Sequence, residues 1–396
     1  MDALLKPRNA GEVEEAVRWA AAEEQPLEVI GTGSKRGLGH PVQTAHVLDL
    51  SALAGVETYE PAELVLTVKA GTPIAEIEAL VEENGQELSF EPMDYGPLLG
   101  RPAGGGTIGG VLAANLAGPR RIKSGAARDH VLGMEAVSGR GEQFVSGGKV
   151  VKNVTGYDLP RALCGSFGTL AVTTSATLKV NPKPETTATL EISGLSDEDA
   201  VTALCRAMGS SAEVSGAAHL PAGLWGETAR TVLRLEGFQA SVDYRFQSLN
   251  SLLSGFGPVR RLEDGDSRPL WAGIRDAAPH VGKAGTVWRV SVAPTAGPGV
   301  VAQLKEKLPL SAFYDWSGGL VWICFEDGEL HEAELRAAVA ASGGGHATLV
   351  RATGAVAASV PVFQPQPEAL AALSRRLKEQ FDPNGILNPG RMVTGV

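Results

Sequence analysis

Glycine crowds one stretch of the chain, residues 101–118, where it occupies six of eighteen positions. This density is too high for an ordinary helix or strand, because glycine loses the most backbone entropy on folding. Glycine instead lets main-chain N–H groups come close to a ligand, and successive N–H groups form a concave site for anions such as a pyrophosphate. A flexible surface loop is the alternative, although the stretch continues into the apolar residues 111–114, which are typical of a buried segment. We therefore expect the stretch to hold an anionic ligand with its backbone.

Length, charge and cysteine content restrict the classes of protein. A chain of 396 residues allows two or three domains, each with its own core. The net charge of -10 and the lack of a long basic run argue against nucleic acid as a partner. No apolar run has signal-peptide or membrane-spanning length, so we expect a cytoplasmic protein without a transmembrane segment. Cys164, Cys205 and Cys324 are far apart, which favours three buried, unreactive thiols over a disulfide framework, an iron–sulfur motif or a metal site.

A second glycine loop occupies residues 31–37, directly after a predicted strand at 27–30. Arg36 stands where a dinucleotide fingerprint needs its third glycine, and Pro41 follows where its helix would run. The pattern therefore argues against a Rossmann site. A loop of free N–H groups beside Lys35 still suits a pyrophosphate.

The rest of the chain predicts two different halves. The first is mixed α and β, with these elements: a helix starting near residue 10, a strand at 64–68, a helix at 72–85, a hairpin across 131–145 and a strand at 170–180. Pro182 and Pro184 mark a boundary. Strands and helices then alternate to residue 352, which predicts an α+β domain with helices on one face of a largely antiparallel sheet. A last helix at 367–381 is expected to turn Leu370, Leu373 and Leu377 inward.

Four segments together resemble the FAD-binding fold of the vanillyl-alcohol oxidase type: 31–34, 107–110, 165–170 and 387–391. Within that fold, residues 152–159 and 344–351 are similar to the E subunit of bacterial glycolate oxidases. The resemblance covers nearly the whole chain, with the motifs in family order. It implies an α+β fold, with a two-subdomain FAD-binding domain of the PCMH type at 1–183 and an antiparallel-sheet cap at 184–352. A C-terminal segment at 353–396 would return to the FAD site.

The resemblance implies a non-covalent FAD whose isoalloxazine faces the cap. Covalent attachment in this fold commonly uses a histidine in the first glycine loop or a cysteine near the second, whereas Ser34 takes the first position and no cysteine precedes Cys164. The residues that would contact the cofactor are Val29, Ile30, Gly31, Thr32, Gly33, Ser34, Lys35, Arg101, Pro102, Gly105, Gly106, Thr107, Ile108, Gly109, Gly110, Ala114, Asn115, Ala117, Phe167, Gly168, Thr169, Leu170, Val172 and Asn388. Asn388 is also explained as a turn former before Pro389.

The expected activity follows from what the resemblance covers and what the chain lacks. The catalytic partner subunit of this oxidase and related D-2-hydroxy-acid dehydrogenases carry a histidine-rich metal and substrate cluster, which is not visible here. His346 is the one catalytic candidate, with a structural role in a strand as its alternative. We therefore expect an FAD-binding oxidoreductase subunit that relays electrons in glycolate catabolism. Its partners would be a homologous flavoprotein subunit, an iron–sulfur subunit and a small 2-hydroxy-acid substrate, with peripheral attachment to the inner membrane through the partners.

Two other functions remain open from the sequence. One is a self-sufficient FAD-dependent 2-hydroxy-acid dehydrogenase, and the other is a structural subunit of the complex without redox activity. Reduction of the isolated protein by candidate hydroxy acids would distinguish a self-sufficient dehydrogenase from a subunit that needs its complex. The flavin content of the protein tests whether it is a structural subunit.

Overall fold

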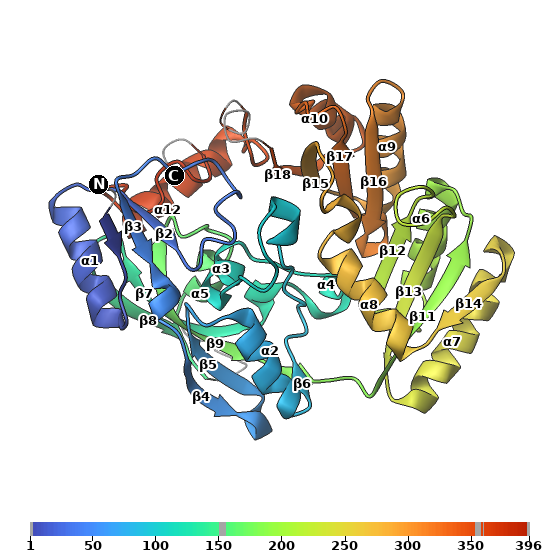
Figure 1. The fold of residues 1–396 in the computed structure, drawn as a ribbon, viewed down its shortest axis with the longest axis horizontal. Coiled ribbons are helices and arrows are strands. Elements are labelled where there is room, and N and C mark those ends of the chain that lie inside the picture. The colour runs from blue at the N-terminus through green and yellow to red at the C-terminus, as the bar shows by residue number, and fades with distance from the viewer. Residues whose placement is uncertain (1–2, 150–155, 353–357, 359, 394–396) are drawn as a thin grey trace.

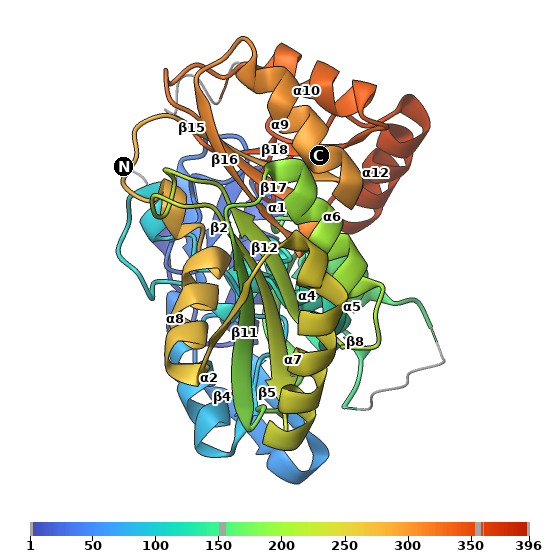
Figure 2. The same cartoon turned by 90° about the vertical axis from the view of Figure 1, so that its right-hand side faces the viewer.

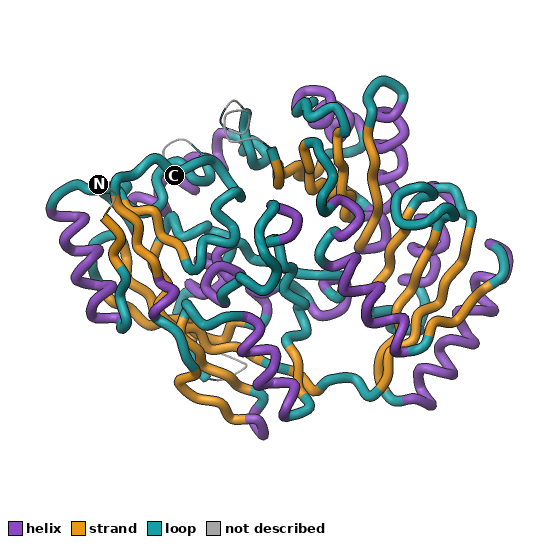
Figure 3. Tube along the Cα trace, in the orientation of Figure 1, coloured by secondary structure: helices purple, strands orange, loops and turns teal. Residues whose placement is uncertain are grey.

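The computed structural model describes residues 3–149, 156–352, 358 and 360–393. Two β-rich halves lie side by side, and both ends of the chain belong to the first half (Figure 1). Loops and short helices fill much of the space between the halves (Figure 3). Residues 152–155 of the predicted motif at 152–159 lie outside the described part of the chain.

The first half contains two main sheets. A parallel sheet has the order β1-β3-β2, with the bounds β1 Ala3–Leu5, β2 Leu27–Ile30 and β3 His46–Asp49. An antiparallel sheet has the order β4-β5-β9-β7-β8, with the bounds β4 Val56–Glu60, β5 Val65–Lys69, β7 Val131–Ser138, β8 Gln143–Gly147 and β9 Ala171–Lys179. The strands β6 (Gln86–Glu87) and β10 (Asn181–Pro182) form a small antiparallel pair. The strands predicted at 27–30, 64–68 and 170–180 and the hairpin across 131–145 are confirmed.

A capping residue starts the first helix of this half, as the sequence predicts. Asn9 accepts a hydrogen bond from the backbone N–H of Glu12 at 2.9 Å and so begins α1 (Ala10–Ala22). Val13 and Val17 of α1 are buried in a cluster with Leu27 of β2, Leu48 of β3 and Val137 of β7. The remaining helices are α2 (Ile74–Glu83), α3 (Ile108–Ala113), α4 (Arg121–Ser124) and α5 (Leu159–Leu163).

The second half, the cap, is built on one eight-stranded sheet in which every pairing is antiparallel. Its order is β14-β11-β13-β12-β16-β17-β15-β18. The strand bounds are β11 Thr186–Ser193, β12 Gly216–Leu220, β13 Arg230–Gly237, β14 Val259–Leu262, β15 Thr286–Val292, β16 Leu310–Asp315, β17 Leu320–Phe325 and β18 Gly345–Arg351. The helices on its outer face are α6 Asp197–Met208, α7 Gln239–Leu253, α9 Gly297–Lys305 and α10 Glu332–Ala341 (Figures 1 and 2). The predicted α+β class is confirmed.

One helix of the cap, α8 (Asp264–Arg275), packs on the opposite face of the sheet, toward the first half (Figure 1). Trp271 is buried there and donates a hydrogen bond through Nε1 to Thr189 of β11 at 2.8 Å. Sequence analysis did not predict α8, because Pro269 lies inside it and proline normally interrupts a helix.

Buried ion pairs join the two halves. Arg120 of the first half donates two hydrogen bonds to Glu236 of the cap, at 2.8 and 2.9 Å, and Arg234 of the cap donates two to Glu91 of the first half, both at 2.8 Å. A hydrophobic core that includes Phe90 and Trp322 also runs through both halves. The domain limits 1–183, 184–352 and 353–396 stay a prediction, close to the start of β11 and the end of β18.

The expectation that the last helix turns three leucines inward is wrong. In α12 (Glu368–Phe381), Leu370, Leu373 and Leu377 are 48%, 55% and 37% exposed. Lys378 is buried instead and donates hydrogen bonds to the Thr169 and Leu387 carbonyls at 2.6 and 3.1 Å. Its ion pair with buried Asp382, at 2.7 Å, compensates the buried charge, so the helix docks through a polar face that a hydrophobic pattern does not reveal.

Candidate cofactor site

Strand β2 leads the chain directly into the first glycine loop. No backbone N–H of residues 32–35 is hydrogen-bonded to another residue in the described part of the chain. Gly33 has a φ of +75°, a conformation that glycine adopts without steric cost. These residues line a cavity that opens to solvent. Free N–H groups beside a cavity are suited to phosphate oxygens.

The second glycine stretch approaches the first loop closely. A Cβ on Gly31 would overlap the Thr107 hydroxyl, and Thr32 donates a hydrogen bond to the Gly105 carbonyl. Part of this stretch is helical, so the expectation that glycine excludes a helix here is wrong: Thr107 caps α3, which contains Gly109 and Gly110. A Cβ on Gly109 would lie 2.8 Å from the Ala70 carbonyl oxygen. Close packing against Ala70, the residue after β5, therefore requires glycine at position 109, whereas other glycines of the stretch give access to the cavity.

The ammonium of Lys35 lies at the junction of the two loops, in a cavity lining that also contains Arg36 and Arg391, both paired with Glu28. A Cβ on Gly106 or Gly110 would lie 3.3 or 3.5 Å from Nζ, so both glycines leave space for this side chain. Burial lowers the pKa of Lys35 to about 8, although the nearby Asp94 carboxylate acts in the opposite direction. A bound dianion would stabilise the protonated ammonium.

The C-terminal tail supports the first loop from behind. The Asn388 side chain accepts a hydrogen bond from the Val29 N–H and donates one to the Phe167 carbonyl, both at 2.8 Å. Arg391 forms an ion pair of 3.1 Å with the buried Glu28 of β2 and donates hydrogen bonds to the carbonyls of residues 36 and 38, both at 3.0 Å. The tail therefore holds β2, the first loop and the segment at 165–170 together.

Two further cavities adjoin the first. One shares Gly31, Thr107 and Gly110 with it and is also lined by the first residues of β9. The other lies between the two halves; we call it the junction cavity. Phe167 lines all three cavities. An elongated cleft with a cationic, N–H-rich centre and largely apolar ends fits a dinucleotide such as FAD.

Most of the predicted cofactor residues line this cleft. Those lining the three cavities are Val29, Ile30, Gly31, Thr32, Gly33, Ser34, Lys35, Thr107, Gly109, Gly110, Ala114, Asn115, Ala117, Phe167, Gly168 and Val172. Gly106 lines a neighbouring cavity that also contains Lys35. These cofactor contacts stay predictions.

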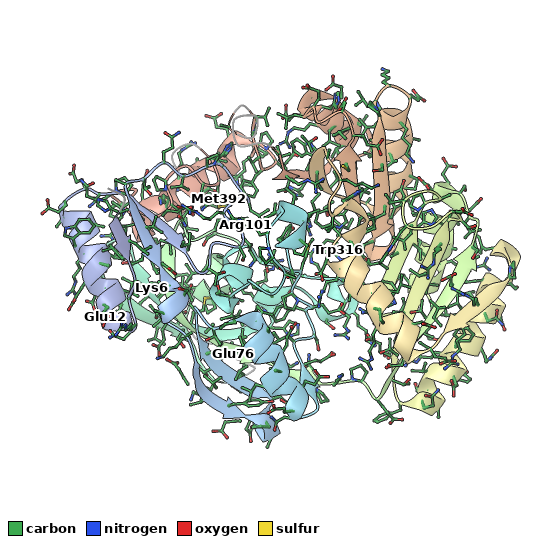
Figure 4. All side chains as sticks on the ribbon, in the orientation of Figure 1. Lys6, Glu12, Glu76, Arg101, Trp316 and Met392 are labelled. Carbon is green, nitrogen blue, oxygen red and sulfur yellow. The ribbon has the colours of Figure 1, made fainter. Side chains whose placement is uncertain are left out.

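The structure does not bring the other predicted residues to the cleft wall. Arg101 and Pro102 are exposed, and Arg101 lies in the central loop region (Figure 4). Those that support the cleft without lining it are Gly105, Ile108, Thr169, Leu170 and Asn388. His346 is exposed near the start of β18 and does not line the cleft either, although Thr348 of the same strand does.

Sequence analysis missed the residues that distant segments bring to the junction cavity. They are Leu38, Gly39, Met93, Tyr95, Leu116, Arg289, Thr348, Leu349, Val350 and Phe363. Arg289 is the sole charged side chain in this lining. A signal exists in the sequence, since Arg289 interrupts an apolar strand, but the strand pattern alone does not say which face it occupies.

Two of the three predicted buried thiols are buried, Cys164 and Cys324, whereas Cys205 is half-buried. Burial raises the pKa of the Cys164 thiol to about 12, so it is a weak nucleophile. Neither cysteine nor histidine lines the three cavities within the described residues. Across the same residues, no group of three or more His, Cys, Asp or Glu side chains is placed to hold a metal ion, and no helix is both long and apolar enough to span a bilayer.

Comparison with known proteins gives matches to both ends of the chain. The family model described as FAD binding domain matches residues 1–147, and the model described as FAD linked oxidases, C-terminal domain, matches residues 364–392. The chain is 35% identical over 383 residues to the glycolate oxidase subunit GlcE of Escherichia coli, covering 96% of this chain and 95% of that one.

Other matches are partial or distant. The glycolate oxidase subunit GlcD of Bacillus subtilis is 34% identical over 190 residues, which span 48% of this chain and 39% of GlcD. A crystal structure of p-cresol methylhydroxylase with substrate bound has a TM-score of 0.72 and 17% identity, with 99% of this chain and 88% of that chain covered. At this identity the structural likeness supports the fold alone.

Proposed function

This chain belongs to the family of glycolate oxidase GlcE subunits, and from that membership we propose that it is the FAD-binding subunit of a multi-subunit glycolate oxidase. It is an FAD-linked oxidoreductase by family, and relatives that match part of the chain act on hydroxy acids by name, such as a D-2-hydroxyglutarate dehydrogenase of Xanthomonas citri. We propose glycolate or a related small 2-hydroxy acid as the electron donor of the complex.

The observation that carries the proposal is the cleft between the two glycine segments. The free N–H groups of residues 32–35 and the ammonium of Lys35 would hold the pyrophosphate, because together they offer fixed donors and positive charge to a dianion. The mainly apolar lining of the other two cavities would hold the adenine and the isoalloxazine.

FAD, when bound, supplies the two-electron chemistry of such an oxidoreductase. The protein's own contribution is to position the cofactor and to exclude water. Phe167 packs edge to face on Phe363, with 5.0 Å between ring centroids, and both rings line the junction cavity. Asn388 fixes the Phe167 backbone through its 2.8 Å hydrogen bond, so the tail sets the position of this wall.

We also propose that the chain works with a homologous flavoprotein subunit and an iron–sulfur subunit, which would account for any peripheral attachment to the inner membrane. Two observations support partnership. Among the described residues, those that line the cleft include no histidine or carboxylate to act as a substrate base, and His346 is outside it. The chain is also related along its whole length to a protein named as an oxidase subunit.

The first experiment is a visible absorption spectrum of the purified chain followed by acid precipitation. A flavin spectrum is expected, with all the yellow colour released into the supernatant, because neither cysteine nor histidine lines the described cleft. Colour retained in the pellet contradicts non-covalent binding. Absence of flavin after reconstitution with FAD contradicts the proposed cofactor and favours a structural subunit.

The second experiment compares the chain alone with the chain coexpressed with its two proposed partners. Glycolate and D-lactate are added anaerobically, and dye reduction is followed. Turnover is expected with the partners and not without them. Equal turnover by the isolated chain contradicts the need for partners and favours a self-sufficient 2-hydroxy-acid dehydrogenase.

A further inference from the structure

One carboxylate closes the loop at residues 94–104, which leads into the second glycine segment. Asp94 accepts a hydrogen bond from the Gly96 N–H at 2.9 Å on one oxygen and from the Gly104 N–H at 2.7 Å on the other. The next residue, Gly105, accepts the hydrogen bond from Thr32 of the first glycine loop. Asp94 therefore fixes the backbone directly beside the point where the two glycine segments meet.

The cap holds this loop at two points. Asp276, the residue after α8, accepts a hydrogen bond from the Asp94 N–H at 2.9 Å. Arg351 of β18 donates a hydrogen bond to the Leu98 carbonyl, in the middle of the loop, at 3.2 Å. Arg101 of the same loop lies in the central loop region between the halves (Figure 4). The loop belongs to the first half by sequence, and side chains of the cap help to position it.

Asp276 is itself held firmly. Arg275, the last residue of α8, donates hydrogen bonds to both of its carboxylate oxygens, at 2.9 and 2.7 Å. A Cβ on Gly118 of the first half would lie 3.0 Å from the Arg275 Cγ, so this end of α8 packs closely on the first half. Because a guanidinium paired with both oxygens of a carboxylate has a defined geometry, Asp276 presents a fixed acceptor to the Asp94 N–H.

Asp94 also acts on the Lys35 ammonium. Both line the neighbouring cavity that contains Gly106. The other charged side chains that line a cavity with Lys35 are Glu78, Arg275, Arg36 and Arg391. The three arginines are paired with Glu28 or Asp276, and burial raises the pKa of Glu78. Burial lowers the pKa of Lys35 to about 8, and the Asp94 carboxylate opposes this decrease. Asp276 lines neither cavity, so the two carboxylates differ in their effect on Lys35.

We propose that the contact between Asp276 and Asp94 couples the cap to the retention of FAD. Asp276 is a positioning residue that acts through Asp94, because it holds the loop from which the second glycine segment starts. Docking of the cap then slows the release of FAD. Coupling between two sites is reciprocal, so bound FAD also stabilises the docked cap. The inference deepens the proposed function, on which it rests for the cofactor.

The first test is the rate of FAD release from the reconstituted chain, followed by flavin fluorescence after dilution. Asp276→Ala removes the acceptor of the Asp94 N–H and is expected to speed release roughly 5- to 50-fold. Asp276→Asn keeps an acceptor oxygen at this position and should stay within about 3-fold of the natural rate.

Asp264→Ala is the matched control. Asp264 is at the other end of α8 and accepts a hydrogen bond from the Thr187 N–H, which belongs to the cap itself, at 3.0 Å. This variant therefore loses a comparable hydrogen bond in the same helix without touching the loop at 94–104. It should also release FAD within about 3-fold of the natural rate.

The pH dependence of FAD affinity separates positioning from charge. Asp94→Asn loses one acceptor oxygen and the charge beside Lys35, so FAD should leave faster and the affinity should begin to fall below the natural midpoint of about 8. Asp276→Ala keeps the Asp94 charge, so its midpoint should stay near 8. In the double variant, the increase in release rate should be smaller than the product of the two single effects, because Asp276 acts through Asp94.

Amide hydrogen exchange provides a measurement that does not need FAD. Exchange in residues 94–106 should rise in Asp276→Ala and not in Asp264→Ala. FAD release from Asp276→Ala at the natural rate overturns the coupling, as does a pH midpoint that moves as far in this variant as in Asp94→Asn. A chain that holds no FAD in any variant overturns the proposed function and the coupling together, whereas a chain that holds FAD equally well in all variants overturns the coupling alone.

Discussion

Asn388 and Val29 are 359 residues apart in sequence and are joined by a hydrogen bond of 2.8 Å from the Val29 N–H to the Asn388 Oδ1. The same carboxamide donates to the Phe167 carbonyl, also at 2.8 Å. Asn388 is 2% exposed and has a φ of +43°. One side chain of the tail therefore connects the strand before the first glycine loop to the aromatic wall of the cleft.

Asn388→Ala is expected to lower the melting temperature and to release FAD at least several-fold faster. It leaves the Val29 N–H and the Phe167 carbonyl without partners, at a cost of about 1–3 kcal/mol each. Asn388→Gly also loses both hydrogen bonds but relieves the backbone strain at this φ. A defect that both variants show is therefore due to the lost hydrogen bonds. Thermal melts and FAD release rates are measured; FAD retention by both variants equal to the natural chain contradicts this role.

Gly33→Asp is expected to abolish FAD binding while the protein stays soluble, because a carboxylate would face the pyrophosphate in the loop with free N–H groups. Gly33→Asn is the control. Both residues tolerate positive φ similarly and have nearly the same shape. The nearest atom to a Cβ here, at 3.2 Å, belongs to the flexible Arg36 side chain. Flavin content of the two purified variants is compared. If Gly33→Asp keeps as much FAD as Gly33→Asn, the loop does not contact the phosphates.

FAD affinity is expected to weaken as the pH rises above about 8. The pKa of Lys35 is about 8 in the free protein, so below this pH the ammonium is already charged and binding needs no proton. Above it, binding must recruit a proton to pair with the dianion. Calorimetry in buffers of different ionisation enthalpy should show proton uptake. Lys35→Arg, which stays charged, should bind with little pH dependence, and an unchanged pH profile in that variant rules out Lys35 as the source.

Glu236→Gln is expected to destabilise the protein by about 3 kcal/mol at pH 7, since it leaves buried guanidinium groups short of a partner. Burial alone would raise the pKa of Glu236, but Arg234 and Arg120 lower it from the ordinary 4.5 to about 2. Its stabilising contribution is therefore present above pH 4.5 and is lost as the pH falls toward 2.

Urea unfolding of the two proteins from pH 7 to pH 3 should show a difference that shrinks on acidification. Glu263→Gln serves as the control, because Glu263 is 70% exposed and its pair with Arg261 lies at the surface. This variant should differ from the natural chain by less than about 1 kcal/mol. A difference for Glu236→Gln that does not change with pH contradicts the assignment.

Leu373→Ser in α12 is expected to change the free energy of unfolding by no more than about 0.5 kcal/mol, because its side chain is 55% exposed. Leu204→Ser in α6 is the buried counterpart and should cost about 3 kcal/mol or more. Chemical denaturation of the purified variants gives both values. A large loss in Leu373→Ser would show that the inward orientation expected from the sequence is the correct one.

Local chemistry determined much of this protein from sequence alone. Capping at Asn9, the Val- and Thr-rich composition of residues 170–180 and the two glycine segments are short-range signals. The first two predict a helix and a strand that the structure confirms, and the glycine segments meet beside one cavity. The glycine of residue 109 shows the limit of such signals. A Cβ at this position would lie 2.8 Å from the Ala70 carbonyl oxygen, a contact that no pattern within residues 101–118 discloses.

Tertiary structure alone decided which distant residues complete the site. Arg289 reaches the cleft because β15 pairs with β17 and β18 and the cap packs on the first half. Lys378 and Asp382 are buried as a pair, so α12 turns its leucines to solvent against the expectation from hydrophobic periodicity. The physical reason is common to both cases. Helix propensity and capping depend on residues a few positions away in the sequence. The energies of burial and charge pairing depend instead on residues that are far apart in the chain and become neighbours only in the folded structure.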